Sequence, residues 1–466
     1  MSLLMYLKRL CPIGCVVVLF AVNAVAANDR PNIIYVLADD LGYGDLSCYG
    51  QSTLKTPNLD QMAAEGMRFT RHYAGSTVCA PSRCVLMTGK HIGHASVRGN
   101  QGGLILDAEV TIPEMLRDRG YATACVGKWG VGSPPPIDDP KRNGFDHFFG
   151  YVNMYHAHNF YPEFVVRNGQ RVPLRNVLNE KWKNTKVIPG REGRGVSATK
   201  IDYVPDLVTE EALMFIESNK DQPFFLYHAL NVPHANNEGT REPGTAGMEV
   251  PTLGEFSGKD WPEPEKGFAA MMRNIDRDMG RLFAKLRELK IDDNTIVFFS
   301  SDNGPHQEGG HKMPFFDSNG ELQGMKRDLF EGGIRVPLIA RWPGKIQAGS
   351  VTDHVCGFQD MMPTLADLSG AHAPKLDGLS IAPTLLRDGS KQQKHEHLYW
   401  EFTEKGGRQA VLKDHWKAIR LDWIKNPDGP IELYDVSTDT AEATDVASDH
   451  PQVVREMVQI MSREHR

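Results

Sequence analysis

Apolar residues along this chain follow two patterns that alternate over most of its length. Short, almost continuous apolar runs have the length of buried strands, and longer stretches repeat apolar residues every three or four positions, as helices do. The strand-like runs are residues 32–38, 122–126, 223–230 and 295–300, and the helix-like stretches are one opening at Thr56-Pro57 and residues 111–119, 204–219 and 265–289. This alternation predicts an α/β fold, with a large mainly parallel central sheet flanked by helices.

The pattern changes after about residue 371. The segments there are strand-like at residues 397–402, 408–413, 415–421 and 431–436, and helical at residues 451–464. We therefore expect one large domain over residues 27–370. A small domain is expected over residues 371–466, built from an antiparallel sheet with one helix. Residues 134–200 and 234–265 are rich in Pro, Gly and polar residues, and we expect them to be long loops over a site.

Residues 1–26 have the features of an export signal peptide. A basic pair precedes an apolar stretch, residues 10–22, and the small residues Ala24 and Ala26 then suit signal peptidase. A membrane anchor or a lipid attachment at Cys15 is the alternative interpretation. Because no other segment has about 20 apolar residues, we expect an exported protein, periplasmic or extracellular, without a membrane span in its mature form.

Charge and cysteine content narrow the class of function. The chain has 466 residues, with 52 Lys and Arg against 59 Asp and Glu, which gives a net charge of −7. A general nucleic-acid-binding protein would be basic, so no nucleic-acid partner is expected. Seven cysteines occur, and five of them follow the predicted signal. An odd number without dense spacing is not typical of a disulfide framework and leaves at least one thiol unpaired, for which Cys79 is our candidate.

Acidic and amide residues follow two of the predicted strands directly. Asp39-Asp40 ends the first strand, and Asp302-Asn303 follows the run at 295–300. Open α/β sheets place their sites at the carboxyl ends of strands, and hard cations such as calcium prefer all-oxygen ligands. Each pair alone also fits an ordinary turn, where these residue types are common.

Cys79 begins the motif Cys-Ala-Pro-Ser-Arg, which is followed by Leu86-Met87-Thr88-Gly89. A buried structural cysteine beside a helix-starting proline is the simpler interpretation. The motif nevertheless resembles the sulfatase signature, in which a maturation enzyme oxidises the cysteine to formylglycine (3-oxoalanine). The resemblance implies that Cys79 is the modified residue and that a formylglycine-generating enzyme is a partner.

The resemblance to the sulfatase family extends in order over nearly all of the mature chain. The matching segments are PNIIYVLADDLGYGD at 31–45, GKWG at 127–130, Pro233-His234, SDNG at 301–304, and Lys326 with the following Glu331-Gly332-Gly333. The family fold is an alkaline-phosphatase-like α/β sandwich with a small C-terminal domain, which agrees with the apolar pattern.

The resemblance also assigns roles by position. The metal ligands that it implies, for one Ca²⁺ ion, are Asp39, Asp40, Cys79 as formylglycine, Asp302 and Asn303. Arg83 matches the residue that steadies the aldehyde hydrate. Lys128 and Lys326 match the lysines that hold the sulfate oxygens, and His234 matches a histidine at the ester or leaving oxygen.

The implied chemistry explains why a modified residue is needed. An aldehyde hydrate has two hydroxyls, and one can attack sulfur while the cation acidifies it and neutralises sulfate charge. Asp302 could accept the proton, and the lysines supply positive charge where negative charge develops. The ester S–O bond breaks, and the alcohol leaves with a proton from His234 or Lys326. The second hydroxyl then loses its proton, sulfate is expelled, and the aldehyde is restored. A sulfate ester of unmodified cysteine or serine has no second hydroxyl and could not release sulfate in this way.

One position departs from the family pattern. Many members have Gly-Lys-Trp-His, with a histidine in the active site, where this chain has Gly130. His156 and His158 lie in the following loop and are candidates for the missing substrate contact. An H-x-H pair also suggests zinc, but zinc sites need three or four ligands, and such a pair in a loop is more often solvated.

Several functions stay open at this stage. The main expectation is a sulfuric ester hydrolase acting on a sulfated small molecule or saccharide. A formylglycine-dependent phosphonate or phosphodiester hydrolase of the same superfamily is the nearest alternative, because fold analogy alone does not settle the chemistry. A secreted carbohydrate-binding protein with an inactive site is the second.

Overall fold

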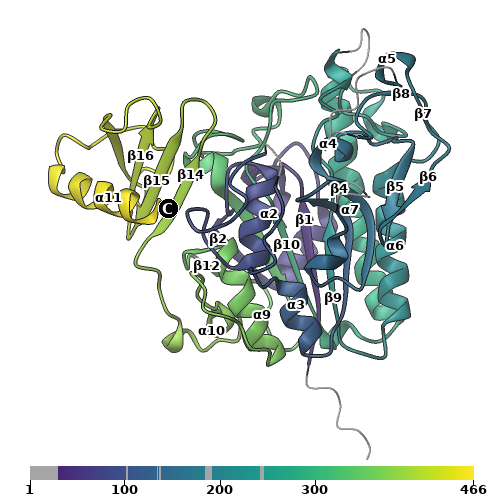
Figure 1. Cartoon of the computed structure of the whole chain (residues 1–466), viewed down its shortest axis with the longest axis horizontal. Coiled ribbons are helices and arrows are strands. Elements are labelled where there is room, and N and C mark those ends of the chain that lie inside the picture. Colours follow the sequence, from purple (N-terminus) through teal and green to yellow (C-terminus); the bar gives the residue numbers. More distant parts are fainter. Residues whose placement is uncertain are drawn as a thin grey trace, which may run out of the picture.

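The computed structural model describes residues 30–100, 103–133, 135, 138–183, 192–241 and 246–465, so the predicted export signal lies outside it. A large mixed sheet dominates this part of the chain, and a small antiparallel sheet lies beside it (Figure 1). In order across the large sheet, the strands are β12 (Ser350–Thr352), β2 (Met67–Tyr73), β11 (Arg335–Arg341), β10 (Thr295–Ser301), β1 (Asn32–Ala38), β9 (Phe224–Ala229), β3 (Ala122–Gly130), β4 (His147–Asn153), β5 (Phe164–Arg167) and β6 (Gln170–Pro173), with β13 (Cys356–Gly357) also paired to β2.

The centre of the large sheet is parallel, as the apolar runs predict. β10, β1, β9, β3 and β4 run in the same direction, and β1 lies between β10 and β9 along its whole length. Four of these five strands were predicted from near-continuous apolar sequence, which is typical of strands covered on both faces. Their carboxyl ends therefore meet at one edge of the sheet.

The outer strands differ from the sequence-based expectation. β11 joins β10 and β2 in antiparallel pairs, and β5 and β6 form an antiparallel ribbon against β4. Residues 134–200 are thus not only loops, because β4 to β6 extend the sheet there and β7 (Val177–Leu178) pairs with β8 (Ser197–Thr199). The sheet is mixed, with its parallel strands at the centre, and the predicted mainly parallel α/β fold is confirmed.

Helices cover both faces of the large sheet. The helices are α1 (Pro57–Glu65), α2 (Cys79–Thr88), α3 (Ile112–Asp118), α4 (Met154–Ala157), α5 (Glu180–Lys183), α6 (Val204–Ser218), α7 (Glu263–Glu288), α8 (Glu331–Ile334), α9 (Met361–Ser369), α10 (Ala382–Leu385) and α11 (Pro451–Glu464). Side chains of β1 alternate between two cores: Ile33 and Tyr35 pack with α2, α3 and α9, whereas Ile34 and Val36 pack with α1, α6 and α7. This two-sided burial fixes β1 as the central strand.

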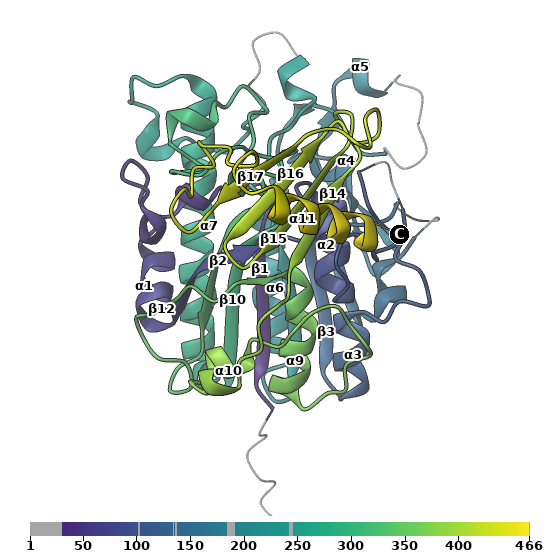
Figure 2. The same cartoon turned by 90° about the vertical axis from the view of Figure 1, so that its left-hand side faces the viewer.

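The small C-terminal sheet and its helix match the prediction closely. The sheet contains β14 (Leu398–Phe402), β15 (Arg408–Lys413), β16 (Trp416–Leu421) and β17 (Ile431–Asp435), all antiparallel to their neighbours. Helix α11 packs on this sheet, as Figure 2 shows from the side of the small sheet. Apolar residues of the small sheet share one core cluster with α2 and α9, so the two parts are packed together.

A buried ion cluster ties the small sheet to the large one. Lys417 of β16 donates to Glu331 Oε1 at 2.8 Å and lies 3.0 Å from Glu442 Oε1, and none of the three side chains is more than 2 % exposed. Tyr73 donates a further hydrogen bond to Glu331. Removing one partner of such a group leaves uncompensated charge in the interior.

We expect Lys417→Met to lower the free energy of unfolding by about 3–5 kcal/mol, because two buried carboxylates lose their cation. Lys413→Met is the matched control on the neighbouring strand. Its partner Glu456 is exposed, so the loss there should be about 0–1 kcal/mol. Urea unfolding of both variants measures the difference. Equal losses would contradict the assignment of this cluster as a structural link.

Two further expectations concern the whole chain. In the described residues, Cys48, Cys79, Cys84, Cys125 and Cys356 are all free, in agreement with the absence of a disulfide framework. Within the same residues, none of the helices combines the length and the apolar character needed to cross a membrane. The domain boundary near residue 371 stays a prediction.

Candidate active site

The residues singled out in the sequence meet at the carboxyl edge of the central strands. Asp39 and Asp40 directly follow β1, Asp302 and Asn303 follow β10, and His234 lies just beyond β9. Lys128 belongs to β3, Cys79 and Arg83 to α2, and Lys326 to the loop before α8. The structure therefore brings together nine residues from across the chain.

The acidic group at the centre of the site is held rigidly. Asp40 N–H donates to Asp302 Oδ1 at 3.0 Å, and Asn303 Nδ2 donates to Asp40 Oδ1 at 2.7 Å. Leu41 N–H donates to Ser301 Oγ, which joins the ends of β1 and β10 a second time. Asp40 has φ +64°, a left-handed conformation that Asp and Asn tolerate better than most residues. This turn points two consecutive carboxylates at the same space.

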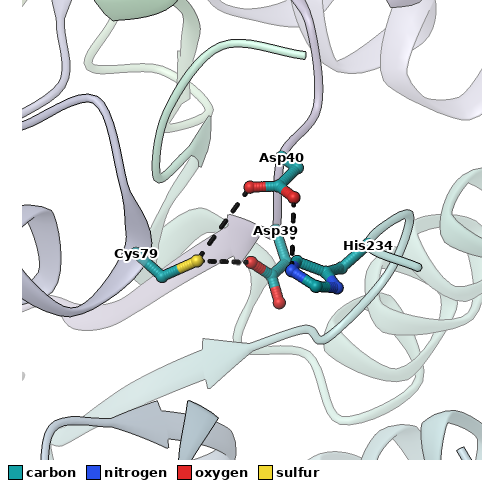
Figure 3. Close-up of side chains that lie close together, drawn as sticks. All are labelled: Asp39, Asp40, Cys79 and His234. Atoms are coloured by element: carbon teal, nitrogen blue, oxygen red, sulfur yellow. Dashed lines mark hydrogen bonds and ion pairs between the residues drawn. The ribbon is translucent and has the colours of Figure 1, made fainter. Parts of the chain in front are cut away.

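Helix α2 presents Cys79 and Arg83 to these acids. Cys79 is the first residue of the helix, and its Sγ lies 3.4 Å from Asp39 Oδ1 and 4.0 Å from Asp40 Oδ1 (Figure 3). Arg83, one turn later and fully buried, donates to Asp302 Oδ2 through Nε at 2.9 Å and Nη2 at 2.7 Å. The thiol therefore faces the carboxylates, and the guanidinium fixes the third one.

Two lysines and a histidine complete the site. Lys128 Nζ donates to Asp39 Oδ2 at 2.6 Å, and Lys326 Nζ donates to Asp40 Oδ2 at 2.8 Å. His234 Nδ1 lies 2.6 Å from the carbonyl oxygen of Ala235, which accepts its proton, so Nε2 is left to accept from Lys326 at 3.1 Å. Each lysine thus neutralises one carboxylate of the Asp39-Asp40 pair.

Burial and crowding of charge shift several pKa values. Burial and the nearby Asp39 charge raise the pKa of Asp302 to about 6. Burial and Lys326 hold the pKa of His234 well below its ordinary value, so this imidazole is neutral. Burial raises the pKa of the Cys79 thiol well above its ordinary value. An unmodified Cys79 would therefore be protonated and a poor nucleophile.

The donor set fits a hard divalent cation. Asp39, Asp40, Asp302 and Asn303 are all buried and offer only oxygen ligands, as calcium prefers. Asn303 Oδ1 is buried and accepts no hydrogen bond, although its Nδ2 is bonded to Asp40. A buried carbonyl oxygen without a donor costs free energy unless a cation or another group satisfies it. This oxygen belongs to one of the residues that the family resemblance implies as metal ligands.

The two loop histidines have different surroundings. His156 is fully buried, and its Nε2 lies 2.8 Å from the carbonyl oxygen of Phe164. His158 instead stacks on His234, with ring centroids 4.8 Å apart and an interplanar angle of 16°. Its Nδ1 lies 3.4 Å from Glu238 Oε2. Of the two candidates, His158 is the one that contacts a residue of the candidate site, His234.

The backbone explains why the family histidine is absent at position 130. Gly130 has φ +79°, which strains residues that carry a side chain. A Cβ there would lie 3.0 Å from Cδ of Arg83, which is too tight unless Arg83 moves. Because Arg83 is fixed by Asp302, a histidine at this position would disturb the guanidinium.

Glu308 is a site residue that the sequence reasoning missed. Its Oε2 lies 2.9 Å from Lys326 Nζ and 3.7 Å from His234 Nε2, and its Oε1 accepts from Arg327 at 2.7 Å. The carboxylate is 17 % exposed, so it lies at the rim of an otherwise buried site. The only signal in the sequence was its place in the loop that begins with Asp302-Asn303.

Comparison with known proteins agrees with this geometry. The mixed sheet, its two helical layers and the charged site at the strand ends define an alkaline-phosphatase-like fold. The sulfatase family model matches residues 31–371, and the model for the C-terminal region of N-sulphoglucosamine sulphohydrolase matches residues 323–465. The chain belongs to the sulfatase family.

Individual relatives are similar over most of the chain. An N-acetylgalactosamine-6-O-sulfatase of Bacteroides thetaiotaomicron is 30 % identical over 93 % of both chains. An N-acetylgalactosamine-6-sulfatase of Canis lupus familiaris is 33 % identical over 78 % of this chain and 67 % of its own. The crystal structure of Ps i-CgsB with a neocarrahexaose superimposes with a TM-score of 0.76, at 27 % identity over 94 % of each chain.

Proposed function

We propose that this sulfatase removes a sulfate group from a sulfated saccharide, with the 6-sulfate of N-acetylgalactosamine as the first substrate to test. The observation that carries the proposal is the convergence of Cys79, a buried carboxylate group and two buried lysines at one sheet edge. Two relatives named for N-acetylgalactosamine-6-sulfate and one solved with a neocarrahexaose support a saccharide substrate.

The cation in this proposal is one calcium ion held by Asp39, Asp40, Asp302 and Asn303, with residue 79 beside it. When bound, calcium would supply Lewis acidity and neutralise charge on the sulfate. Lys128 donates a hydrogen bond to Asp39, and Lys326 donates one to Asp40. A cation bound to these carboxylates would replace the two ammonium groups. The lysines would then be available to sulfate oxygens.

The nucleophile in this proposal is formylglycine at position 79. As its hydrate, it would supply a hydroxyl nucleophile and a second hydroxyl through which sulfate can leave. Arg83 would hold Asp302 in place, and Asp302 would be the base that takes a proton at this position. His234 and Lys326, which are hydrogen-bonded to each other through His234 Nε2, would lie at the leaving oxygen, and one of them would give it a proton. The high pKa of the thiol supports modification over direct attack by cysteine.

Export and maturation belong to the same proposal. The charged segment and small residues before position 27 favour cleavage of a signal peptide and a periplasmic or extracellular enzyme. A formylglycine-generating enzyme would have to act on the 79–83 motif before the chain folds, because Cys79 is buried in the folded chain. N-terminal sequencing of the secreted protein tests the cleavage site.

A substrate panel tests the proposed reaction. Purified protein is offered N-acetylgalactosamine-6-sulfate, an aryl sulfate, a phenylphosphonate ester and a phosphodiester, and released sulfate or phenol is measured. We expect the sulfate esters to be cleaved with a kcat/KM at least about 10²-fold higher than the phosphorus esters. Faster cleavage of the phosphonate would replace the proposal by the phosphonate hydrolase alternative. No cleavage of any ester by formylglycine-bearing protein would favour a binding function.

We propose that His158 replaces the histidine missing at position 130 and that it does so by positioning His234. We expect His158→Ala to lower kcat by about 10–100-fold and to change KM much less, because the stack acts on proton transfer rather than on sulfate binding. His156→Ala is the companion variant. It should lower thermal stability but leave kcat of the folded enzyme near wild type, since His156 bonds only a backbone carbonyl. A wild-type kcat for His158→Ala would sink this assignment.

A further inference from the structure

A second cluster of metal-ligating side chains lies away from the active site, where the loop after α2 meets the end of α11. His91 and His94 come from this loop, Glu464 is the last residue of α11, and Asp377 comes from the segment after α9. One ligand atom from each of His91, His94 and Glu464 lies within 4.8 Å of the others. Because α2 spans ten residues from Cys79, about 15 Å of helix separates this cluster from Cys79.

His94 is already arranged as a metal ligand. Its Nδ1 lies 2.9 Å from Asp377 Oδ2, which also accepts the backbone N–H of His91 at 3.0 Å. The ring proton is therefore on Nδ1, and Nε2 carries a lone pair. Nε2 is buried without a hydrogen-bond partner and lies 3.8 Å from Glu464 Oε2. Metal-bound histidines commonly have this arrangement, in which one ring nitrogen donates to a carboxylate and the other carries the lone pair that binds the metal.

Glu464 offers one oxygen to the same space. Its Oε1 accepts from Arg463 at 2.7 Å and lies 3.3 Å from His397 Nε2. Its Oε2 is left facing His94 and lies 3.2 Å from His91 Nε2. A lone pair and a carboxylate oxygen that face each other repel unless a proton or a cation lies between them. Ligand atoms of a tetrahedral zinc ion lie roughly 3.3 Å apart. The His91 separation of 3.2 Å matches this spacing, and the His94 separation of 3.8 Å is longer and would have to shorten on binding.

His91 is the ligand that must adjust. Its Nδ1 accepts the N–H of Gly93 at 3.1 Å, so its ring proton is on Nε2 and points to Glu464. Cation binding at Nε2 would move this proton to Nδ1 and give up the Gly93 bond, since metal binding at histidine replaces a proton. Gly93 itself allows the close approach, because a Cβ there would lie 2.2 Å from the carbonyl oxygen of Glu464.

We propose that His91, His94 and Glu464 bind a divalent transition-metal cation of the zinc class, with Asp377 hydrogen-bonded behind His94. Two imidazoles and one carboxylate suit zinc, whereas calcium takes six to eight oxygen ligands. The bound ion would cross-link the end of the helix that carries Cys79 to the last turn of the C-terminal domain. This role is structural and does not depend on the proposed sulfatase reaction.

The test uses the full-length mature protein, stripped with EDTA and supplied with excess calcium so that the oxygen-rich active site is filled. Zinc chloride is added, the protein is desalted, and zinc per chain is measured by mass spectrometry of the metal. Wild type is expected to hold one zinc more per chain than His94→Ala. Its melting temperature should rise by about 2–5 °C with zinc and fall again with EDTA, and that of His94→Ala should not.

Two controls keep the outcome decisive. His372→Ala removes an exposed histidine outside the cluster and should bind zinc as wild type does. Cys79→Ala should also retain the extra zinc, which separates this site from the catalytic one. If His94→Ala fails to fold, Glu464→Gln keeps the side-chain shape and should lose the zinc. Equal zinc content in wild type and a folded cluster variant, or no zinc-dependent melting shift in wild type, would overturn the proposal.

Discussion

Cys79→Ala is expected to lower the rate of sulfate ester hydrolysis by on the order of 10⁴-fold or more, because it removes the proposed nucleophile. The fold should be retained. Cys79 contributes one sulfur at the start of α2, and the helix gains from alanine, which has a high helix propensity. The lost activity would then reflect chemistry and not unfolding.

Cys84→Ala is the matched control for this variant. Cys84 lies in the same helix and is fully buried, but it faces the apolar core and not the acids. Its loss should lower stability by about 1–2 kcal/mol and leave kcat/KM within a few-fold of wild type. Both proteins are assayed after mass spectrometry of the peptide containing residue 79, where conversion of cysteine to formylglycine removes about 18 Da. Full activity of protein with only unmodified cysteine would refute the proposed nucleophile.

The central fold was readable from the sequence because its strands are buried on both faces. Residues 32–38 and 295–301 are buried at every position, and their apolar residues do not alternate with polar ones, which makes the two strands easy to identify. They are neighbours in the parallel core. The small C-terminal sheet was equally clear, since its strand-like runs follow one another closely and β15 is joined to β16 by a tight turn. In both regions, local pattern and tertiary burial agree.

The outer strands could not be predicted in this way. β2 reads MRFTRHY, with charged residues between apolar ones, and its partners β11 and β12 come from far along the chain. β4 contains the segment HFFGYVN within a region rich in Gly and Pro, so its local composition indicates loops. These segments form strands because the central sheet offers unpaired backbone groups at its edges. Local periodicity carries no information about this tertiary contribution.

The candidate site shows the same division. Consecutive pairs of candidate ligands, such as Asp39-Asp40, and the motif at Cys79 are local and could be identified one by one. Contacts between distant segments could not be predicted from local motifs. The stack of His158 on His234 joins two loops, and the ion pair of Glu308 with Lys326 joins two parts of a third loop. The zinc-class cluster is of this second kind, because His94 and Glu464 are 370 positions apart. No spacing in the sequence relates them.

Charge balance connects the site's residues into one unit. Three carboxylates lie within a few ångströms of one another, and Arg83, Lys128 and Lys326 each pair with one of them. Such buried groups are stable only when every charge has a partner. A calcium ion would exceed this balance by two positive charges, and a bound sulfate ester would restore part of it. The site is thus expected to bind cation and anionic substrate together.

Asp40→Asn is expected to lower kcat/KM by on the order of 10³-fold at millimolar calcium and to raise the calcium concentration needed for half-maximal activity by on the order of 10²-fold, because one proposed anionic ligand is lost. The substitution is mild for the backbone. Asp40 adopts φ +64°, and asparagine tolerates this left-handed conformation as well as aspartate does. An amide at this position also removes the charge that pairs with Lys326.

Asp317→Asn is the control for this variant, because Asp317 is exposed and has a similar left-handed φ of +54°. It should leave both the rate and the calcium requirement unchanged. Activity is titrated with calcium after EDTA treatment, and calorimetry measures calcium affinity independently of turnover. If Asp40→Asn keeps wild-type calcium affinity, the carboxylate is not a ligand and serves Lys326 alone. A fall in affinity that matches the fall in activity supports the cation as the partner around which the carboxylates are arranged.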